Sequence, residues 1–166
     1  MDKMMGKTLR ASLALNREII MQIGYANAED HHPLIELWEA SVRATHHFLP
    51  EAEILALKPL ILEHYFDAVT LHCARTEEGN IAGFSGLHEG KLEMLFVAPE
   101  ARGGGVGRLL VEHAIGPCGV TQVDVNEQNE QAVGFYLKMG FTVTGRSALD
   151  GQGKPYPLLH MALAMR

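Results

Sequence analysis

Four glycines fall within five positions, 103–107, between a strand-like segment and a helix-like segment. Residues 92–98 are apolar at nearly every position, which is typical of a strand buried on both faces. From Val106 onward, apolar residues recur at the spacing of an amphipathic helix. Glycines permit positive φ angles and close approach of a ligand, and the first turn of a helix leaves N–H groups unpaired. The pattern therefore predicts a backbone cradle for an anion, most naturally a pyrophosphate, at the end of a central strand.

Two well-known phosphate loops do not fit this glycine turn. The Walker loop requires Lys and then Ser or Thr after its last glycine, whereas Arg108 follows Gly107. The dinucleotide pattern G-x-G-x-x-G also fails, because its third glycine would fall on Arg108 or Leu110. What remains is R-x-x-G-x-G over 102–107, with Arg102 and Arg108 placed to add positive charge at the rim. The alternative is a flexible glycine turn without a ligand.

The rest of the chain alternates strand-like and helix-like segments. Strands are predicted at 19–25, 69–76, 81–87, 92–98, 120–125, 141–144 and 158–163. Helices are predicted from Asp30, as N-cap, to Val42, over 54–66, over 106–114 and over 129–139. In the second helix Pro59 is expected to kink or restart the chain. The core residues expected there are Ile54, Leu55, Leu62, Tyr65 and Phe66. The order predicts an α/β protein whose mixed sheet of about seven strands carries helices on both faces.

Length and composition limit the classes of protein that this chain can represent. The 166 residues suit one domain, 18–166, preceded by a poorly defined extension over 1–17. A formal net charge of −6 and a pI near 5.8 argue against a nucleic-acid partner. No apolar run approaches the roughly 20 residues of a membrane-spanning helix. No cleavable leader is recognised either, so we expect no membrane partner and a cytoplasmic protein.

The cysteines and histidines follow no metal-site pattern. Cys73 and Cys118 are far apart in apolar surroundings and are expected to be buried free thiols. Nine histidines include the adjacent pairs 31–32 and 46–47. Adjacent side chains point in different directions, and no HExxH or Cys/His spacing accompanies them. We therefore expect no metal site.

Two motifs in the second half of the chain resemble those of the GNAT superfamily of N-acetyltransferases. The first is R-x-x-G-x-G over 102–107, similar to the superfamily's acyl-CoA pyrophosphate loop. The second is N-x-x-A over 129–132, followed by F-Y-x-x-x-G-F over 135–141. Both occur in the family's order, and the predicted elements from about Ile19 to Leu163 match as well. The resemblance implies a single GNAT-like domain with a mostly antiparallel sheet and with acetyl-CoA as the acyl donor.

The resemblance also implies where acetyl-CoA would bind. The pantetheine arm would pair with free backbone groups of Leu95 and Val97, with Phe96 between them, like an added strand. Asn129 would hydrogen-bond the arm, and Phe135 would pack near it. The pyrophosphate would lie on the backbone amides of Arg102, Gly103, Gly104, Gly105, Val106, Gly107 and Arg108.

Two further segments are similar to one small bacterial subgroup of the superfamily: 44–49, A-T-H-H-F-L, and 153–158, G-K-P-Y-P-L. The loop between the first two helices borders the acceptor pocket in similar proteins, so His46 and Phe48 are candidate substrate-binding residues. An ordinary loop histidine is the alternative for His46. The acceptor is expected to be a primary amine on a small molecule or a peptide, and the chain a monomer or a homodimer.

Transfer to an amine needs a base and an acid. An alkyl amine attacks a thioester only after losing a proton, and the leaving thiolate, whose conjugate acid has a pKa of about 8.5, benefits from a proton donor. Tyr136 occupies the family's tyrosine position and is the predicted general acid; the alternative is a core tyrosine. Glu93 is the candidate base, directly or through water, and alternation places it on the face of Leu95. The alternative is a glutamate that faces solvent. The backbone N–H near Leu95 would stabilise the oxyanion.

Three other functions are alternatives to acetyl transfer from acetyl-CoA to an amine. An acyl-CoA sensor without turnover would keep the cradle, although the presence of both Tyr136 and Glu93 favours an enzyme. A transferase for another acyl donor, such as succinyl-CoA, would need a cationic group near the acyl end. A toxin acting on charged tRNA is disfavoured by the net charge of −6.

Overall fold

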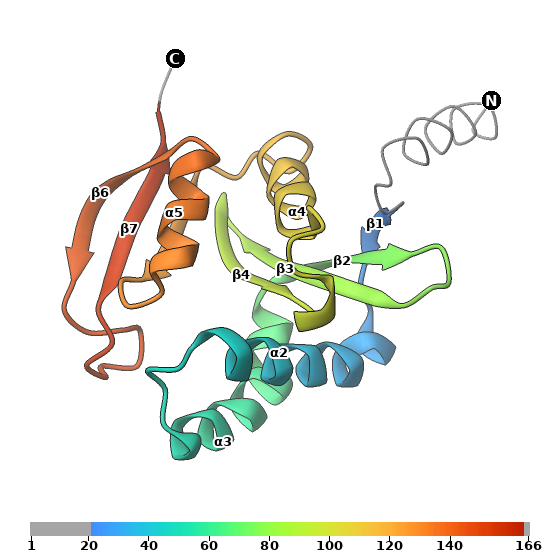
Figure 1. The fold of residues 1–166 in the computed structure, drawn as a ribbon, viewed down its shortest axis with the longest axis horizontal. Coiled ribbons are helices and arrows are strands. Elements are labelled where there is room, and N and C mark those ends of the chain that lie inside the picture. Colours follow the sequence, from blue (N-terminus) through green and yellow to red (C-terminus); the bar gives the residue numbers. More distant parts are fainter. Residues whose placement is uncertain (1–20, 165–166) are drawn as a thin grey trace.

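The computed structural model describes residues 21–164, which form a seven-stranded sheet with helices packed on it (Figure 1). The strand order is β1-β2-β3-β4-β5-β7-β6. The strands are β1 Met21–Tyr25, β2 Thr70–Thr76, β3 Ile81–His88, β4 Lys91–Val97, β5 Gln122–Asn126, β6 Phe141–Ser147 and β7 Leu158–Leu163. All neighbours are antiparallel except β4 and β5. This confirms the predicted mixed sheet; the expected boundary at 17–18 and the strand start at Ile19 lie outside the described residues.

Helices cover both faces of this sheet (Figure 1). They are α2 His31–Thr45, α3 Glu51–Leu60, α4 Val106–Ile115 and α5 Glu130–Lys138, with a π-helical stretch Ile61–Tyr65 after α3. Short 3-10 turns occupy Ala28–Asp30, Phe66–Ala68 and Pro99–Ala101. On β2, Leu71 and Cys73 belong to the core under α2, whereas Ala74 packs with Val106 and Leu110 of α4. Because alternate side chains of a strand point to opposite faces, α2 and α4 lie on opposite faces. Within 21–164 no helix has the length and apolar character needed to cross a bilayer.

Asp30 is the N-cap residue of α2, as predicted, and a 3-10 turn precedes it. Asn27 caps that turn: its Oδ1 accepts a hydrogen bond from the backbone N of Glu29 at 3.0 Å. Asp30 closes the same capping box by accepting from the backbone N of Asn27 at 3.0 Å. It also accepts from Nη2 of Arg75 at 2.9 Å. The Asp30 side chain therefore makes no capping hydrogen bond to α2 itself, because it is engaged by the preceding turn and by Arg75.

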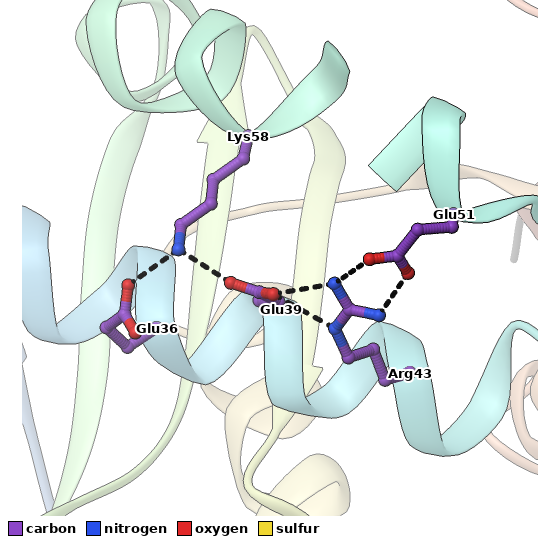
Figure 2. Close-up of polar contacts among 5 residues, drawn as sticks. All are labelled: Glu36, Glu39, Arg43, Glu51 and Lys58. Atoms are coloured by element: carbon purple, nitrogen blue, oxygen red, sulfur yellow. Dashed lines mark hydrogen bonds and ion pairs between the residues drawn. The ribbon is translucent and has the colours of Figure 1, made fainter. Parts of the chain in front are cut away.

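Five charged side chains join α2 to α3 (Figure 2). Glu39 on α2 accepts from Nζ of Lys58 at 2.6 Å and from Nε of Arg43 at 2.9 Å. Arg43 also donates to both carboxylate oxygens of Glu51, the first residue of α3. Lys58 pairs with Glu36 at 2.9 Å as well. Isolated exposed ion pairs contribute little, but a network that shares two cations among three carboxylates fixes the two helices relative to each other. It therefore holds both ends of the loop between them.

The buried side of α3 departs from expectation at two positions. Ile54 and Phe66 are buried as predicted, but Leu55 is 56% exposed and Tyr65 is 36% exposed. Leu55 follows Ile54 by one position, and a step of about 100° takes its side chain out of the buried stripe. Pro59 neither ends nor restarts α3; the π-helical stretch that begins two residues later changes the helical phase before Tyr65.

The two cysteines lie in different surroundings. Both are free, and Cys73 is buried in β2 as predicted. The prediction was wrong for Cys118, which is exposed. It lies in the turn that connects α4 to β5, where the chain runs over the surface.

Candidate active site

A cavity of about 330 Å³ lies where β4, α4 and α5 meet the C-terminal end of α2. Most of the residues predicted from the sequence line it. These are His46, Leu95, Phe96, Val97, Arg102, Gly103, Gly105, Val106, Gly107, Arg108, Asn129, Phe135 and Tyr136. Three predicted residues do not line it: Phe48, Glu93 and Gly104. The structure thus brings the glycine turn, the central strand and the tyrosine to one place.

The cavity exists because β4 and β5 separate. These parallel strands pair only at Lys91 with Gln122 and at Leu92 with Val123. Further along β4 the backbone N of Ala98 donates to the carbonyl of Ala82 on β3 at 2.8 Å. Because backbone groups of successive residues point to alternate sides of a strand, those of Val97 and Leu95 point away from β3. They face the gap and are available to a ligand that adds as a strand.

The glycine turn forms the other wall. Gly105 is the N-cap of α4 with a φ of 87°, and Gly103 has a φ of 81°. A Cβ atom added at either glycine would have no protein atom within 4 Å, so both backbones border open space. Leu109 makes the first α-helical bond, to the carbonyl of Gly105, which leaves the amides at 106–108 without helical partners. This geometry fits a pyrophosphate.

Two amides of the predicted cradle are paired within the turn itself. The amide of Gly104 donates to the carbonyl of Ala101 at 3.3 Å, and the amide of Arg102 donates to Pro99 at 3.3 Å. Those two amides stabilise the turn and are not free for a ligand. The Arg102 side chain hydrogen-bonds Gln131 at the start of α5, so it bridges the two helices that border the cavity.

Helix α5 supplies the third wall. Asn129 is its N-cap, as predicted: Oδ1 accepts from the backbone N of Ala132 at 3.2 Å. The cap uses only the carbonyl oxygen, so the two amide N–H donors of Asn129 stay available to a ligand. Phe135 lies 3.6 Å from the position that a Cβ would take on Gly107, so its ring packs against the start of α4.

Tyr136 is a further residue of the cavity wall. It is 6% exposed, and its ring makes edge contacts with Phe135 and Phe141 at centroid distances of 5.1 and 5.8 Å. The hydroxyl makes no hydrogen bond to any described residue. Complete burial raises the pKa of Tyr136 far above its ordinary value, so the group is protonated at every physiological pH. The ring is held by packing, and its O–H is free to donate to a bound molecule.

The C-terminal end of α2 also borders the cavity, through Ser41, Thr45 and His46. Thr45 Oγ1 donates to the carbonyl of Ser41 at 2.8 Å and lies 2.8 Å from Nδ1 of His46. Burial, with a smaller contribution from the charge of His47, lowers the pKa of His46 to about 4. His46 is therefore neutral at pH 7. Phe48 packs on the outer side of His46, with a ring distance of 5.3 Å.

The loop between β6 and β7 packs against α3, the π-helical stretch and the loop that follows α2. Nζ of Lys154 pairs with Glu53 of α3 at 2.7 Å, and Nε2 of Gln152 donates to the Tyr65 hydroxyl at 2.7 Å. The ring of Tyr156 lies 6.1 Å from that of Phe48. The two sequence segments 44–49 and 153–158 thus lie against each other although they are far apart along the chain.

Glu93 lies elsewhere than predicted. In the pairing with β3, Gly86 faces Met94 and Leu87 faces Leu92, so Glu93 is an extra, bulged residue. Leu92 and Leu95 both pack on the core under α4 and α5, which shows that the alternation changes phase at the bulge. The expectation that Glu93 shares a face with Leu95 by simple alternation therefore has no basis. Its side chain is 35% exposed and lies 3.9 Å from Nζ of Lys91.

A polar chain crosses the sheet next to Glu93. Asp124 on β5 accepts from Nζ of Lys91 at 2.6 Å and contacts Nδ1 of His160 at 2.7 Å. Nε2 of His160 lies 2.6 Å from Oγ of Ser147. Burial by itself raises the pKa of Asp124, but the hydrogen bonds from Lys91 and His160 outweigh it and hold the pKa below its ordinary value. The carboxylate joins β4 to β5 and β7 just before the point where β4 and β5 separate.

Five residues that line the cavity were not predicted as site residues: Ser41, Thr45, Ala101, Gln131 and Ala132. Three of them had a sequence signal. Ser41 is a polar residue on the buried stripe of α2, where it is 5% exposed. Ala132 is the last position of the N-x-x-A motif, and Thr45 belongs to the segment 44–49. Ala101 and Gln131 had no signal, because only the tertiary arrangement brings them to the cavity.

Comparison with known proteins identifies the family. The acetyltransferase (GNAT) domain model matches residues 55–163. The peptidyl-lysine N-acetyltransferase YjaB of Salmonella typhimurium strain LT2 is 43% identical over 143 residues, which is 86% of this chain and 98% of that protein. YjaB of Escherichia coli K12 is 43% identical over 144 residues, 87% of this chain and 97% of that protein.

Comparison with solved structures leads to the same family. The solution structure of apo-form YjaB from E. coli superposes with a TM-score of 0.79 at 41% identity, covering 89% of this chain and all 100% of that one. PaiA N-acetyltransferase from Thermoplasma acidophilum, in complex with coenzyme A, shares the fold with a TM-score of 0.68 at 20% identity over 88% of this chain and 100% of that one. GNAT enzymes use acetyl-CoA. The chain belongs to the GNAT family of N-acetyltransferases.

Proposed function

We propose that this protein transfers the acetyl group of acetyl-CoA to the ε-amine of a lysine in a peptide or protein, by direct attack of the amine on the thioester. The observation that carries the proposal is one continuous cavity that joins the glycine cradle, the free edge of β4 and Tyr136. The acceptor class is supported by the two YjaB relatives, which are named peptidyl-lysine N-acetyltransferases.

The donor is oriented by backbone groups. Its pyrophosphate lies on the free amides at 106–108, where the positive end of the α4 dipole adds to the attraction. Its pantetheine arm runs along β4 and pairs with Leu95 and Val97, and the Asn129 amide donates to it from the other side. The thioester then lies near Leu95, beside Tyr136. A backbone N–H at Leu95 would donate to the oxyanion of the tetrahedral intermediate.

Tyr136 acts as the general acid. As the tetrahedral intermediate collapses, the C–S bond breaks and the sulfur takes the electron pair, so an O–H donor at the sulfur lowers the barrier. Burial raises the pKa of Tyr136, which makes full proton transfer harder. The same desolvation raises the pKa of the departing CoA thiol, so the two pKa values stay closer than in water. The hydroxyl has no other described partner that competes for its proton.

The amine enters from the end that is bordered by His46, Phe48 and Tyr156. Thr45 already donates its hydroxyl proton to Ser41, so its oxygen accepts the Nδ1 proton of His46. Nε2 of His46 then carries a lone pair, which can accept a hydrogen bond from the incoming amine. This assigns His46 a role in positioning the acceptor.

Glu93 remains the candidate base, and it would accept the proton of the amine through a bridging water, not directly. It does not line the cavity, but it sits at the bulge where β4 leaves β5. A water between Glu93 and the amine would pass one proton from the ammonium to the carboxylate before attack. Nζ of Lys91 lies 3.9 Å from the Glu93 carboxylate and orients it beside the bulge.

The test is an acetyl-transfer assay with the full chain, acetyl-CoA and a lysine peptide whose N-terminus is blocked. Released CoA is measured with a thiol reagent, and the acetylated position by mass spectrometry. The proposal predicts equal amounts of CoA and acetyl-lysine. Binding of acetyl-CoA without transfer to any of a panel of peptides and small amines would instead support the sensor, and transfer to small amines alone would exclude a peptide acceptor.

A further inference from the structure

A second cavity, of about 520 Å³, lies at the C-terminal end of α4, away from the glycine cradle at the start of that helix. His72 of β2 and Cys118 of the α4–β5 turn line it. His113, in the last turn of α4, lies beside both. The ligand-type atoms of these three residues all lie within 4.8 Å of one another, although they come from three separate elements. The expectation that the chain has no metal site considered only spacing along the sequence, which cannot detect such a cluster.

We propose that His72, His113 and Cys118 bind a divalent transition-metal ion of the zinc type. Sγ of Cys118 lies 3.8 Å from Nδ1 of His113, and the two imidazole rings are 4.8 Å apart. In a tetrahedral zinc site, neighbouring N and S ligand atoms are about 3.4–3.6 Å apart. Small rotations of the side chains bring the three atoms to that separation. Two imidazoles and a thiolate suit borderline-soft ions and not Mg²⁺ or Ca²⁺.

A second observation points into the same place. His72 is 5% exposed, and its Nδ1 has no hydrogen-bond partner. Oγ of Ser85, which faces His72 across β2 and β3, is likewise buried without a partner. Buried polar atoms are nearly always paired, so two such atoms side by side indicate that a ligand or a bridging group belongs here.

The surroundings suit a cation and leave one position open. His113 lies in the last turn of α4, where the helix dipole favours positive charge. Asp67 and Glu89 line the same cavity and add negative charge. Three protein ligands leave the fourth tetrahedral position for water or an exogenous group. The ion would tie β2 to the end of α4 and to the following turn, independently of acetyl transfer.

Cobalt provides the most direct test, because a thiolate bound to Co²⁺ gives an intense near-ultraviolet charge-transfer band. The full chain without a histidine tag is freed of metal with a chelator and titrated with Co²⁺. We expect the band to saturate at one equivalent and to disappear when Zn²⁺ is added. Zn²⁺ at about 100 times its dissociation constant should raise Tm by about 5 °C or more.

The variants separate this site from adventitious binding. Cys118 is exposed, so Cys118→Ser should fold normally and lose the charge-transfer band. His113→Gln should weaken Zn²⁺ binding by about tenfold or more. His64→Gln removes an exposed histidine of the π-helical stretch and should change nothing. No band in the wild type, a band that persists in Cys118→Ser, or equal weakening by His64→Gln would each overturn the proposal.

Discussion

The Nδ1 atom of His46 lies 2.8 Å from Oγ1 of Thr45, and the Thr45 hydroxyl itself donates to the carbonyl of Ser41. One hydroxyl proton cannot serve both contacts, so His46 must donate its Nδ1 proton and keep the lone pair on Nε2. The relay fixes the tautomer and orientation of a neutral imidazole at the cavity wall. It depends on a helical turn in which residues 41 and 45 are four positions apart.

This buried imidazole predicts how stability depends on pH. The folded pKa of about 4 lies below the unfolded value of about 6.5, so protons bind the unfolded chain more strongly. The contribution of His46 to stability is fully present above about pH 6.5 and is lost as the pH falls toward about 4. The slope is at most about 1.4 kcal/mol per pH unit.

Urea unfolding of the wild type and of His46→Gln between pH 4 and 7, taken in steps of roughly half a unit, measures this slope. The difference between the two free energies of unfolding cancels the carboxylates that titrate in both. We expect this difference to shrink as the pH falls. His64→Gln, at an exposed position, should follow the wild type. Parallel curves for His46→Gln and the wild type would contradict a depressed pKa.

The glycine cradle predicts a selective loss of cofactor binding. In Gly105→Val the new side chain projects into the space assigned to the pyrophosphate. Binding of acetyl-CoA, measured by calorimetry, should weaken by about tenfold or more. The φ of 87° also strains any residue with a Cβ, which costs about 1–2 kcal/mol of stability.

Gly79→Val is the matched control. Gly79 has a φ of 89°, open surroundings and a place in the turn between β2 and β3, away from the cavity. It should lose a similar amount of stability and keep its affinity for acetyl-CoA. If both variants bind alike, the cradle does not hold the pyrophosphate.

Most of the fold follows from local sequence chemistry. The glycine turn, the continuous apolar run of β4 and the Asn129 cap each depend on a few adjacent residues, so their positions were predicted correctly. The resemblance to GNAT enzymes then added the mostly antiparallel pairing of the sheet and the role of the tyrosine. The glycine pattern and the resemblance together named 16 site residues, of which 13 line the cavity; Phe48, Glu93 and Gly104 do not.

The features that the sequence did not predict depend on contacts between segments that are far apart along the chain or on the register of neighbouring strands. The bulge at Glu93 depends on the register between β3 and β4, which strand alternation alone does not contain. The 3-10 turn that precedes α2, with Asn27 as its cap, was not predicted. The cluster of His72, His113 and Cys118 joins residues up to 46 positions apart, and no spacing rule connects a strand, a helix end and a turn in this way.

Glu93 provides a test of the proposed proton route. Glu93→Gln keeps the size of the side chain and removes its ability to accept a proton. We expect kcat at pH 7 to fall by about tenfold or more, with part of the loss recovered at higher pH, where the amine is already deprotonated. Glu78→Gln, at an exposed position in the turn between β2 and β3, should leave kcat unchanged. A Glu93→Gln enzyme with the wild-type pH profile would assign Glu93 to the sheet surface.

Tyr136→Phe tests the central claim most directly. The substitution removes one oxygen, and the ring keeps its edge contacts with Phe135 and Phe141. Two quantities should be measured together: kcat with a lysine peptide, and the dissociation constant of acetyl-CoA. The account predicts that kcat falls by about tenfold or more while the dissociation constant changes by less than about threefold. An unchanged kcat would contradict it, because the buried hydroxyl would then have no part in expelling the thiolate.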